Sequence, residues 1–537
     1  MFTPLRVVIA LEILGVFSMV FGFLPHEAAL FLIGIFAYFA LFAPRKDAVF
    51  FTVFSIPLYT ALPITDVFDT MAGWRIVIAI LFLRVLFVGS VDLFSRSFSP
   101  LQRGAPRLGL FRPRPRSGDH AETALKSARE QFYRTSLTHL GFLVVLFFVL
   151  GALSLLVAQE PSFGVRKLLF LVNIFALFFI IQKVVKNKQD WLYILRYTFL
   201  GALLTLAVGY AQLLNVFFVA LHSFWIWWVG HVIPVFYGTG LANLLSYSNT
   251  WFSYYESAEP TLRIFALFPD SHSFALSMVL LVPITLTYHF VRKNEQRPVA
   301  IFEAVIVLAL LGIIFSGTRG VWVGAIPVFM VLAAAFFTKN FPANLRQFAK
   351  MGLVVLLAFI FLFPVAAQIQ KIAQWSQGGR VSDTTTFSRI STSFRTGEMS
   401  NKGRIQIWKS TIASIVRHPL LGVGIGNYPV VLSENISATK KGASAHSLYL
   451  DFIAEIGILG GIVVLLIFLE ILREAINLCL QSKDLVFGAY AGFFAIFLLW
   501  VMAYSIVDVV LLNDKVMLMF VALVALLYSV SKVKSPG

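Results

Sequence analysis

The sequence predicts an all-α protein, a bundle of membrane-spanning helices, and three observations carry that prediction. Hydrophobic residues make up 59% of the 537 residues, and the mean hydropathy is +0.84. Charged residues amount to 13%, about half of the roughly 25% found in soluble domains. Apolar runs of about 20 residues, the length that crosses about 30 Å of hydrocarbon, recur along the whole chain. These observations exclude a soluble globular fold.

About fourteen apolar runs have the length expected of a transmembrane helix. The first run, at residues 6–24, is followed by further spans, so we expect an anchor there rather than a removable signal peptide. The expected architecture is a polytopic bundle of about 14 helices with one large, helical external loop. The centres of the runs lie near residues 15, 36, 56, 84, 147, 176, 203, 281, 308, 328, 359, 460, 497 and 523.

The net charge of +17 is concentrated in connectors that a count of the spans places on one side of the membrane. Because basic loops tend to stay in the cytoplasm, both termini are predicted to be cytoplasmic. Residues 95–136 are rich in Pro and Arg but lack interleaved aromatic residues, so we expect a linker that touches anionic lipid and no nucleic-acid partner. The basic connectors begin at residues 44, 96, 183, 291 and 338, and the tail is the sixth.

Two long connectors fall on the opposite side. Residues 216–270 are Trp-rich without a clean span, which favours an interfacial or re-entrant piece. Residues 368–445 form a loop with ten Lys and Arg against three acidic residues, and this predicts an anionic partner at the outer membrane face. The predicted regions are 1–94 (N-terminal helices), 95–136 (linker), 137–367 (helices with segment 216–270), 368–445 (external loop) and 446–537 (C-terminal helices).

Arg319 is the first candidate for chemistry on the outer side. In the stretch FSGTRGVWVG it lies between Gly317 and Gly320, at a break between two adjacent spans. An arginine there can reach phosphate groups at the membrane surface. The alternative is an arginine that only snorkels to the interface.

The stretch NKGRIQIWKSTIASIVRHPLLGVGIGNYP supplies the second candidate, Arg404, in the first turn of a predicted amphipathic helix that ends by Pro419. The glycine-spaced segment with Gly422 and Gly424 follows a helix and no strand, so a dinucleotide-binding loop is excluded. We expect instead a tight loop that brings backbone near a substrate. The apolar side chains expected on the buried face of the helix are Ile405, Ile407, Trp408, Ile412 and Ile415.

His446 is the third candidate, in the stretch SAHSLYLDFIAEIGILGG at the outer start of a span. On a helix Asp451 and Glu455 share one face, about 140° from His446, so the three side chains need not converge. A polar cap on the helix is the alternative role for His446, and Ser447 is a further capping candidate.

Together these elements resemble the O-antigen ligase and polymerase superfamily of bacterial membrane glycosyltransferases. The ligases carry His, then Asn, Ser or Gln, nine residues, and Gly-x-x-Gly; here His446 and Ser447 are followed by nine residues and then Gly457 and Gly460. A Ser-Arg-Gly type element is similar to residues 318–320, with Thr in the place of Ser. The family's loop block of Arg, Trp and Pro-x-x-Gly-x-Gly resembles Arg404, Trp408, Pro419, Gly422 and Gly424.

A weaker element, Arg-x-x-Gly-x-Phe ahead of an Asn, is similar to residues 263–272. Here Ala266 stands in place of Gly and His272 in place of Asn, which puts a role for Arg263 in doubt. The resemblance covers residues 263–461, about two fifths of the chain.

The resemblance implies transfer of a glycan from undecaprenyl pyrophosphate to an acceptor hydroxyl at the periplasmic face of the bacterial inner membrane. His446 is then expected to be the catalytic base. Arg319 and Arg404 are expected to bind the diphosphate, because arginine binds phosphate oxygens bidentately and stays charged. Supporting roles fall to Arg263, Ser447, Glu455, Gly422 and Gly424, with Glu455 favoured as a hydrogen-bonding group inside the bundle.

Lipid A–core is the acceptor we favour, which makes the protein a ligase; a growing glycan (polymerase) and a protein hydroxyl (protein O-oligosaccharyltransferase) are the alternatives. A lipid-linked sugar transporter is a further alternative, but its polar residues would gather near the bilayer midplane. The single cysteine, Cys479, excludes an intrachain disulfide and a Cys-based zinc site. No metal-ligand spacing stands out either, so we expect metal-independent, inverting transfer without a cofactor.

Overall fold

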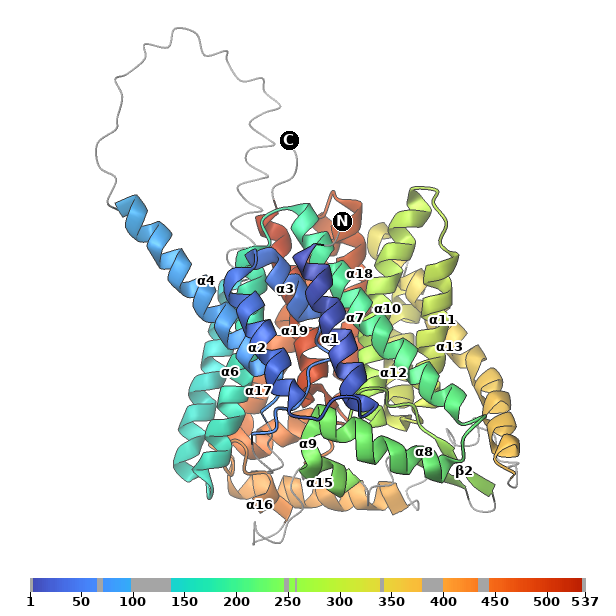
Figure 1. Ribbon diagram of the computed structural model, residues 1–537. Helices are drawn as coiled ribbons and strands as arrows, with labels where there is room; N and C mark the ends of the chain where they lie inside the picture. The colour runs from blue at the N-terminus through green and yellow to red at the C-terminus, as the bar shows by residue number, and fades with distance from the viewer. Residues whose placement is uncertain are drawn as a thin grey trace.

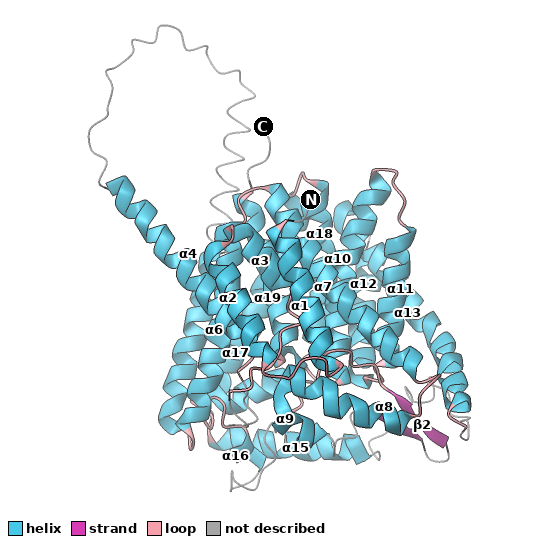
Figure 2. Ribbon diagram, in the orientation of Figure 1, coloured by secondary structure: helices cyan, strands magenta, loops and turns pink. Residues whose placement is uncertain are grey.

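The computed structural model describes residues 3–64, 71–97, 137–245, 251–255, 258–338, 342–378, 399–432 and 444–533. Most of the predicted linker 95–136 therefore lies outside the described residues. The described chain is helical apart from one short hairpin, as Figure 2 shows. The predicted all-α class is confirmed.

The helices form one bundle with their axes running between two ends (Figure 1). Their bounds are α1 Pro4–Val20, α2 Ala28–Phe42, α3 Arg45–Phe54, α4 Gly73–Ser97, the helix Leu137–Val157, α6 Pro161–Val184, α7 Lys188–Asn215, α8 Leu221–Trp227, α9 Ile233–Leu245, α10 Ser271–Asn294, α11 Ala300–Phe315, α12 Arg319–Phe337, α13 Ala343–Ser376, α15 Met399–Arg417, α16 Pro429–Leu432, α17 Leu448–Gln481, α18 Leu485–Tyr504 and α19 Asp514–Ser529.

Within the described residues, nine helices are long and apolar enough to cross a membrane. Helices α2 and α11 are apolar but shorter, with 15 and 16 residues. Helix α3 has 10 residues, and at about 1.5 Å per residue it reaches only half of a bilayer core. A helix lies at or beside each expected centre, but among the described residues nine helices, not fourteen, have the length and composition of a full span.

Helices α10, α18 and α19 form the centre of the bundle. In α10, 89% of the apolar window is buried inside the protein, against 33% in α12, which lies at the periphery. Asp270 caps the start of α10 by accepting from the Ser273 N–H at 2.8 Å, and Asn513 caps α19 in the same manner. These caps fix the ends of the central helices, where several polar side chains lie.

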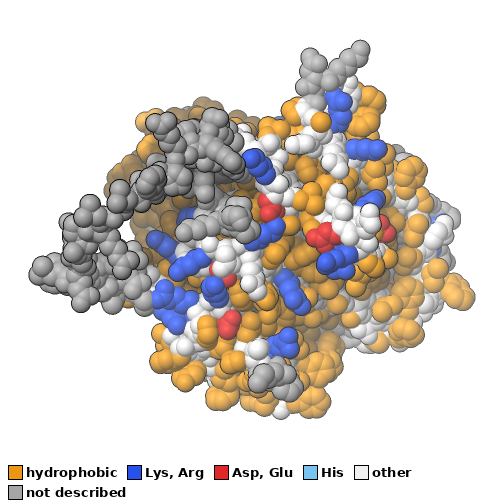
Figure 3. Space-filling model, turned by 90° about the horizontal axis from the view of Figure 1, so that it is seen from above, with side chains coloured by type: hydrophobic (Ala, Val, Ile, Leu, Met, Phe, Trp, Pro, Cys, Tyr) orange, Lys and Arg blue, Asp and Glu red, His pale blue; other side chains and the backbone are white. Residues whose placement is uncertain are grey.

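Several connectors lie together at the end of the bundle where the chain begins. Helix α1 begins at the upper end in Figure 1, where the α6–α7 and α10–α11 connectors and the end of α19 also lie. Figure 3 looks onto this end and shows many Lys and Arg side chains spread over it. The basic connectors that the structure describes, at residues 44, 183 and 291, therefore share one end of the bundle, as the alternation of spans predicts.

The opposite end carries α8, α9, α15, α16 and the hairpin (Figure 1). Strands β1 (Phe252–Tyr255) and β2 (Ala258–Leu262) pair antiparallel, with Phe252 opposite Leu262. Within the Trp-rich segment, α8 continues through the π-helical turn η2 (Trp228–Val232) into α9. This segment lies across the end of the bundle, as an interfacial piece does.

The expected amphipathic helix is α15, but its buried face differs from the expected one. Ile405 and Ile412 are exposed, the latter by 53%, whereas Arg404, Trp408 and Thr411 turn toward the protein. These three follow a spacing of four and three residues along one face of the helix. Helix α13 continues to Ser376, so the external loop starts later than residue 368.

Candidate functional site

His446 lies in a short turn just before α17, at the lower end of the bundle. Its backbone φ is +46°, a left-handed conformation that non-glycine residues seldom adopt. The turn is fixed on both sides of this residue. The indole N–H of Trp408 donates to the Ala445 carbonyl at 2.9 Å, the Ala445 N–H donates to Asp451 at 3.0 Å, and Ser447 is the N-cap of α17.

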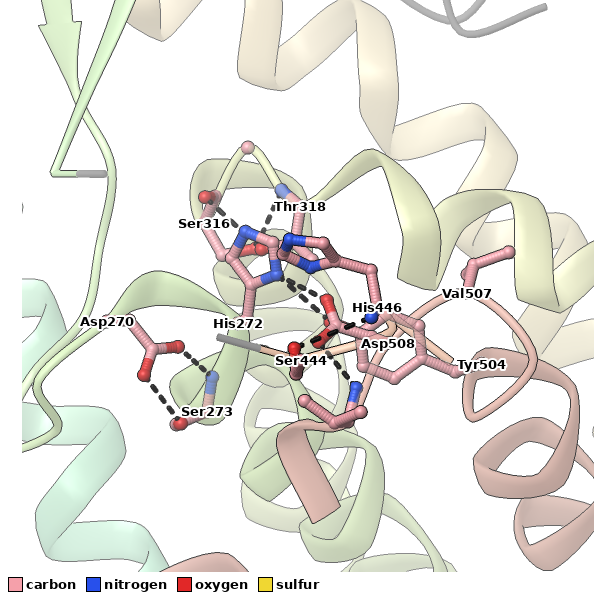
Figure 4. A network of polar contacts seen from close by, with 12 residues as sticks. Asp270, His272, Ser273, Ser316, Thr318, Ser444, His446, Tyr504, Val507 and Asp508 are labelled. Carbon is pink, nitrogen blue, oxygen red and sulfur yellow. Dashed lines mark hydrogen bonds and ion pairs between the residues drawn. The ribbon is translucent and has the colours of Figure 1, made fainter. Parts of the chain in front are cut away.

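Three residues from two other elements form a hydrogen-bonded group beside His446 (Figure 4). His272, in the first turn of α10, places Nδ1 2.6 Å from Oδ2 of Asp508. The Tyr504 hydroxyl, at the end of α18, donates to the same oxygen at 2.9 Å. The Val509 N–H donates to Oδ1 of Asp508 at 2.8 Å. We call His272, His446, Tyr504, Asp508 and Arg404 the imidazole cluster.

Arg404 joins this cluster from the external loop, because its Nη1 donates to the Val507 carbonyl at 3.1 Å. Burial, and then the positive charge of Arg404, lower the pKa of His446 below its ordinary value of 6.5, although Asp508 acts in the opposite direction. Burial alone would raise the pKa of Asp508, but His272 and Arg404 together hold it well below its usual range. The cluster therefore contains a carboxylate and, in His446, an imidazole that is neutral at pH 7.

Arg319 is the first residue of α12, directly after a tight turn of residues 316–318. Gly317 in that turn has φ +64°, and Arg263 donates to its carbonyl through Nη2 at 3.2 Å. Arg263 also donates through Nε to the Ser253 hydroxyl at 3.2 Å, so it links the hairpin to the turn. Figure 4 shows Ser316 and Thr318 next to the two imidazole rings.

Glu455 does not contact the imidazole cluster. Its Oε2 lies 2.6 Å from Nζ of Lys167 on α6, and Asp451 lies 3.6 Å from the same ammonium group. The ammonium also lies 5.3 Å from the centre of the Phe452 ring. We call Lys167, Asp451 and Glu455 the Lys167 cluster; it joins α6 to α17 inside the bundle.

Gly422 and Gly424 pack against a kink in α17. The Val423 N–H donates to the Ala454 carbonyl at 2.8 Å, and the Gly424 N–H donates to the Glu455 carbonyl at 2.9 Å. At Gly457, with φ +78°, a Cβ atom would lie 2.0 Å from the Leu420 carbonyl oxygen. The glycines thus allow two backbone segments to touch directly, and this contact holds the segment after α15 against the kink of α17.

An apolar cavity of about 490 Å³ lies inside the bundle, and its lining includes residues that follow His446 and Asp508 in the chain but none of the imidazole cluster itself. Leu448 and Phe452, just after His446, line one part of it, and Leu511, just after Asp508, lines the same part. Lys183 and Lys532 line another part, on elements that reach the basic end of the bundle. The cavity lies between the helix Leu137–Val157, α6, α17 and α19.

The sequence analysis did not assign His272, Asp508, Tyr504 or Lys167 to the site. Asp508 lies in the short connection after α18. Counting spans puts this connection on the same side as His446, and this signal could have identified Asp508 as a site residue. His272 stood out only as a departure from Asn. Among the residues that the structure describes, no group of three or more His, Cys, Asp or Glu has the arrangement of a metal site.

The fold and this site define a polytopic membrane protein whose polar residues converge at one end of the bundle, beside an apolar cavity. A family model described as O-antigen ligase matches residues 304–465. The match supports the O-antigen ligase superfamily as the family of this chain, and it confirms the resemblance found in the sequence. No curated protein matches the chain.

The matched residues include Arg319, Arg404 and His446, whereas His272 and Asp508 lie outside them. The match and the apolar helices are consistent with an O-antigen ligase-like membrane enzyme.

Proposed function

We propose that the protein transfers a glycan from undecaprenyl pyrophosphate to a hydroxyl of lipid A–core, with His446 as the base. The observation that carries this proposal is a half-buried imidazole, His446, that feels the charge of Arg404 and is followed two residues later by Leu448, which lines an apolar cavity. The cavity suits a polyprenyl chain, and the arginine suits the diphosphate attached to it. Few other substrates combine a long apolar chain with a diphosphate at the membrane surface.

The reaction needs a base because a sugar hydroxyl is a poor nucleophile. His446 takes the proton of the acceptor hydroxyl as its oxygen bonds to the anomeric carbon of the donor. The bond between that carbon and the phosphate oxygen breaks, and the diphosphate leaves with the electron pair. Direct displacement inverts the anomeric centre, and no metal ion is required for it.

Arg319 and Arg404 stabilise the charge that develops on the departing diphosphate. Asp508 stabilises the imidazolium that forms when His446 gains its proton, since its negative charge already raises the pKa of this group. Ser447 caps α17 beside the base, and Arg263 holds the turn that precedes Arg319. Gly422 and Gly424 act through the kink of α17, and Glu455 through the contact with Lys167.

Reconstitution tests the acceptor. Purified protein in vesicles is given a glycan on undecaprenyl pyrophosphate together with lipid A–core, a second lipid-linked glycan or a protein acceptor in separate samples. We expect product with lipid A–core, and the same rate after chelation of divalent ions. Product only with the second glycan would identify a polymerase, and product only with the protein an O-oligosaccharyltransferase.

The orientation is part of the proposal: both termini in the cytoplasm and the imidazole cluster on the periplasmic face of the inner membrane. The support is the concentration of Lys and Arg at the end where α1 begins (Figure 3). Single cysteines at positions 404 and 319 should react with an impermeant reagent in intact cells. The native Cys479 should not react. Reaction of positions 319 and 404 from opposite sides would separate them into two sites and contradict the proposal.

A further inference from the structure

His272 is a feature of this chain that the family element does not explain, because that element has Asn at this position. It lies on the first turn of α10, directly after the helix start at Ser271. Its side chain is 24% exposed, whereas that of Asp508, to which it is bound, is 8% exposed. His272 therefore lies between the buried carboxylate and the more open part of the cluster.

Both carboxylate oxygens of Asp508 have hydrogen-bonding partners within the cluster. Oδ2 accepts from the Tyr504 hydroxyl and faces Nδ1 of His272, while Oδ1 accepts from the Val509 N–H. A bare carboxylate at this place would repel a diphosphate. The His272 ring covers it, so an approaching anion meets an imidazole instead of a negative charge.

The other edge of the His272 ring faces the groups proposed to bind phosphate. In Figure 4 the ring lies between Asp508 and the turn of Ser316 and Thr318, which leads into Arg319 at the N-terminus of α12. Helix N-termini and arginine side chains both favour phosphate groups. Arg404 approaches from the Val507 side, and its charge acts on both His446 and Asp508.

We propose that His272 is a third ligand of the donor's diphosphate, with Nδ1–H donating to Asp508 and Nε2–H donating to a phosphate oxygen. A doubly protonated imidazole offers both donors. Asp270, two residues before His272, acts on the same ring: burial raises the pKa of Asp270, and His272 opposes that effect. The choice of a diphosphate as ligand rests on the proposed function.

This role differs from that of His446. The pKa of His446 is lowered by burial and by Arg404, and the positive charge of His272 lowers it further. One imidazole binds the leaving group, and the other activates the nucleophile.

Binding of undecaprenyl pyrophosphate without a glycan tests this inference in detergent micelles. The variants are His272→Ala, His272→Asn and the double variant His272→Ala with Asp508→Asn. The matched control is His289→Ala, which removes the imidazole near the other end of α10, where it contacts Glu303. Undecaprenol, which lacks phosphate, is the control ligand, and thermal unfolding shows that each variant is folded.

We expect His272→Ala to weaken diphosphate binding about tenfold or more, as expected for loss of one charge-assisted hydrogen bond. His272→Asn keeps a donor toward Asp508 and should lose less. Removal of the Asp508 charge in the double variant should recover part of the loss. Undecaprenol binding should be the same in all variants, and His289→Ala should bind both ligands as the unmodified protein does.

Diphosphate binding by His272→Ala at the unmodified affinity would overturn the inference. An equal loss of undecaprenol affinity would also overturn it, because the defect would then not concern the phosphates. A double variant that binds the diphosphate more weakly than His272→Ala would contradict the inference that His272 shields the negative charge of Asp508. If binding depends on His272 but no acceptor receives a glycan, the proposed function fails and the diphosphate ligand stands.

Discussion

The imidazole cluster and the Lys167 cluster lie on two faces of the start of α17, and both contain carboxylates beside a cation. In the Lys167 cluster, Glu455 and Lys167 are 2.6 Å apart, and the carboxylate is 2% exposed. In the imidazole cluster, the carboxylate of Asp508 is enclosed, but His272 in front of it is 24% exposed and His446 is half-buried. The difference indicates that the first cluster fastens helices together and the second is open to a substrate.

The backbone shows the same contrast. The Lys167 cluster lies against the kink of α17, where the chain of Gly424 and Gly426 donates to Glu455. The imidazole cluster is built from the ends of α10, α18 and α15 and the start of α17. Residues at helix ends can meet a ligand from outside the bundle, whereas residues between packed helices cannot. The predictions below test this division of roles.

The largest effect is expected from His446→Ala. Loss of a general base typically lowers the rate about 10²- to 10⁴-fold, so single-turnover transfer should fall by that amount. Donor binding and thermal unfolding should stay close to those of the unmodified protein, because His446 is not part of the helix contacts. A variant that transfers at more than a tenth of the normal rate would assign the base elsewhere.

Arg404→Lys and Arg319→Lys should each lower the transfer rate about ten- to a hundredfold, although the charge is kept. Lysine lacks the planar fork that binds two phosphate oxygens, and each charge-assisted hydrogen bond contributes about 1.5–3 kcal/mol. The matched control is Arg417→Lys in the last turn of α15, which should transfer normally. Normal transfer rates in both variants would mean that these arginines extend to the membrane interface without binding the diphosphate.

The pH dependence of transfer reports on His446. Because burial and Arg404 lower its pKa below 6.5, the neutral base dominates at pH 7, and the rate should stay level from pH 7 to 8. As the pH falls through the lowered pKa, the base gains a proton and the rate falls, with a midpoint below pH 6.5. A midpoint above pH 7 would contradict a buried base beside a cation.

The smallest effect on transfer is expected from Glu455→Gln, which should keep most of the rate and instead lower stability. The ammonium of Lys167 would lose its nearest carboxylate but keep Asp451 at 3.6 Å. We expect a loss of about 1–3 kcal/mol in the free energy of unfolding, seen as a lower Tm. Loss of transfer with unchanged Tm would reverse the roles of the two clusters.

The sequence was sufficient for the fold class and for the side of the bundle on which the candidate residues lie. Hydropathy and the alternation of basic connectors report directly on the bilayer, which is why both were predictable. Spacing on a helix also separated His446 from Asp451 and Glu455, and the structure places those two carboxylates with Lys167. The count of full-length spans was less certain, because short helices such as α3 have the same composition.

The partners of the site could not be predicted, because they depend on tertiary contacts. His272 and Asp508 are 236 residues apart in the chain and meet only because α10 packs against α18. Lys167 and Glu455 are separated by 288 residues in the same way. The buried face of α15 was predicted only in part: Trp408 and Ile415 are partly buried as expected, but Arg404 and Thr411 also face the protein, while Ile405 and Ile412 face outward.

Transfer by the purified protein tests the central claim most directly. The unmodified protein and His446→Ala are placed in vesicles of one composition with a glycan on undecaprenyl pyrophosphate and lipid A–core, and joined product is quantified over time. We predict product with the unmodified protein and none above background with His446→Ala. Equal product formation by both proteins, or movement of the intact lipid-linked glycan across the vesicle membrane without transfer, would contradict the account.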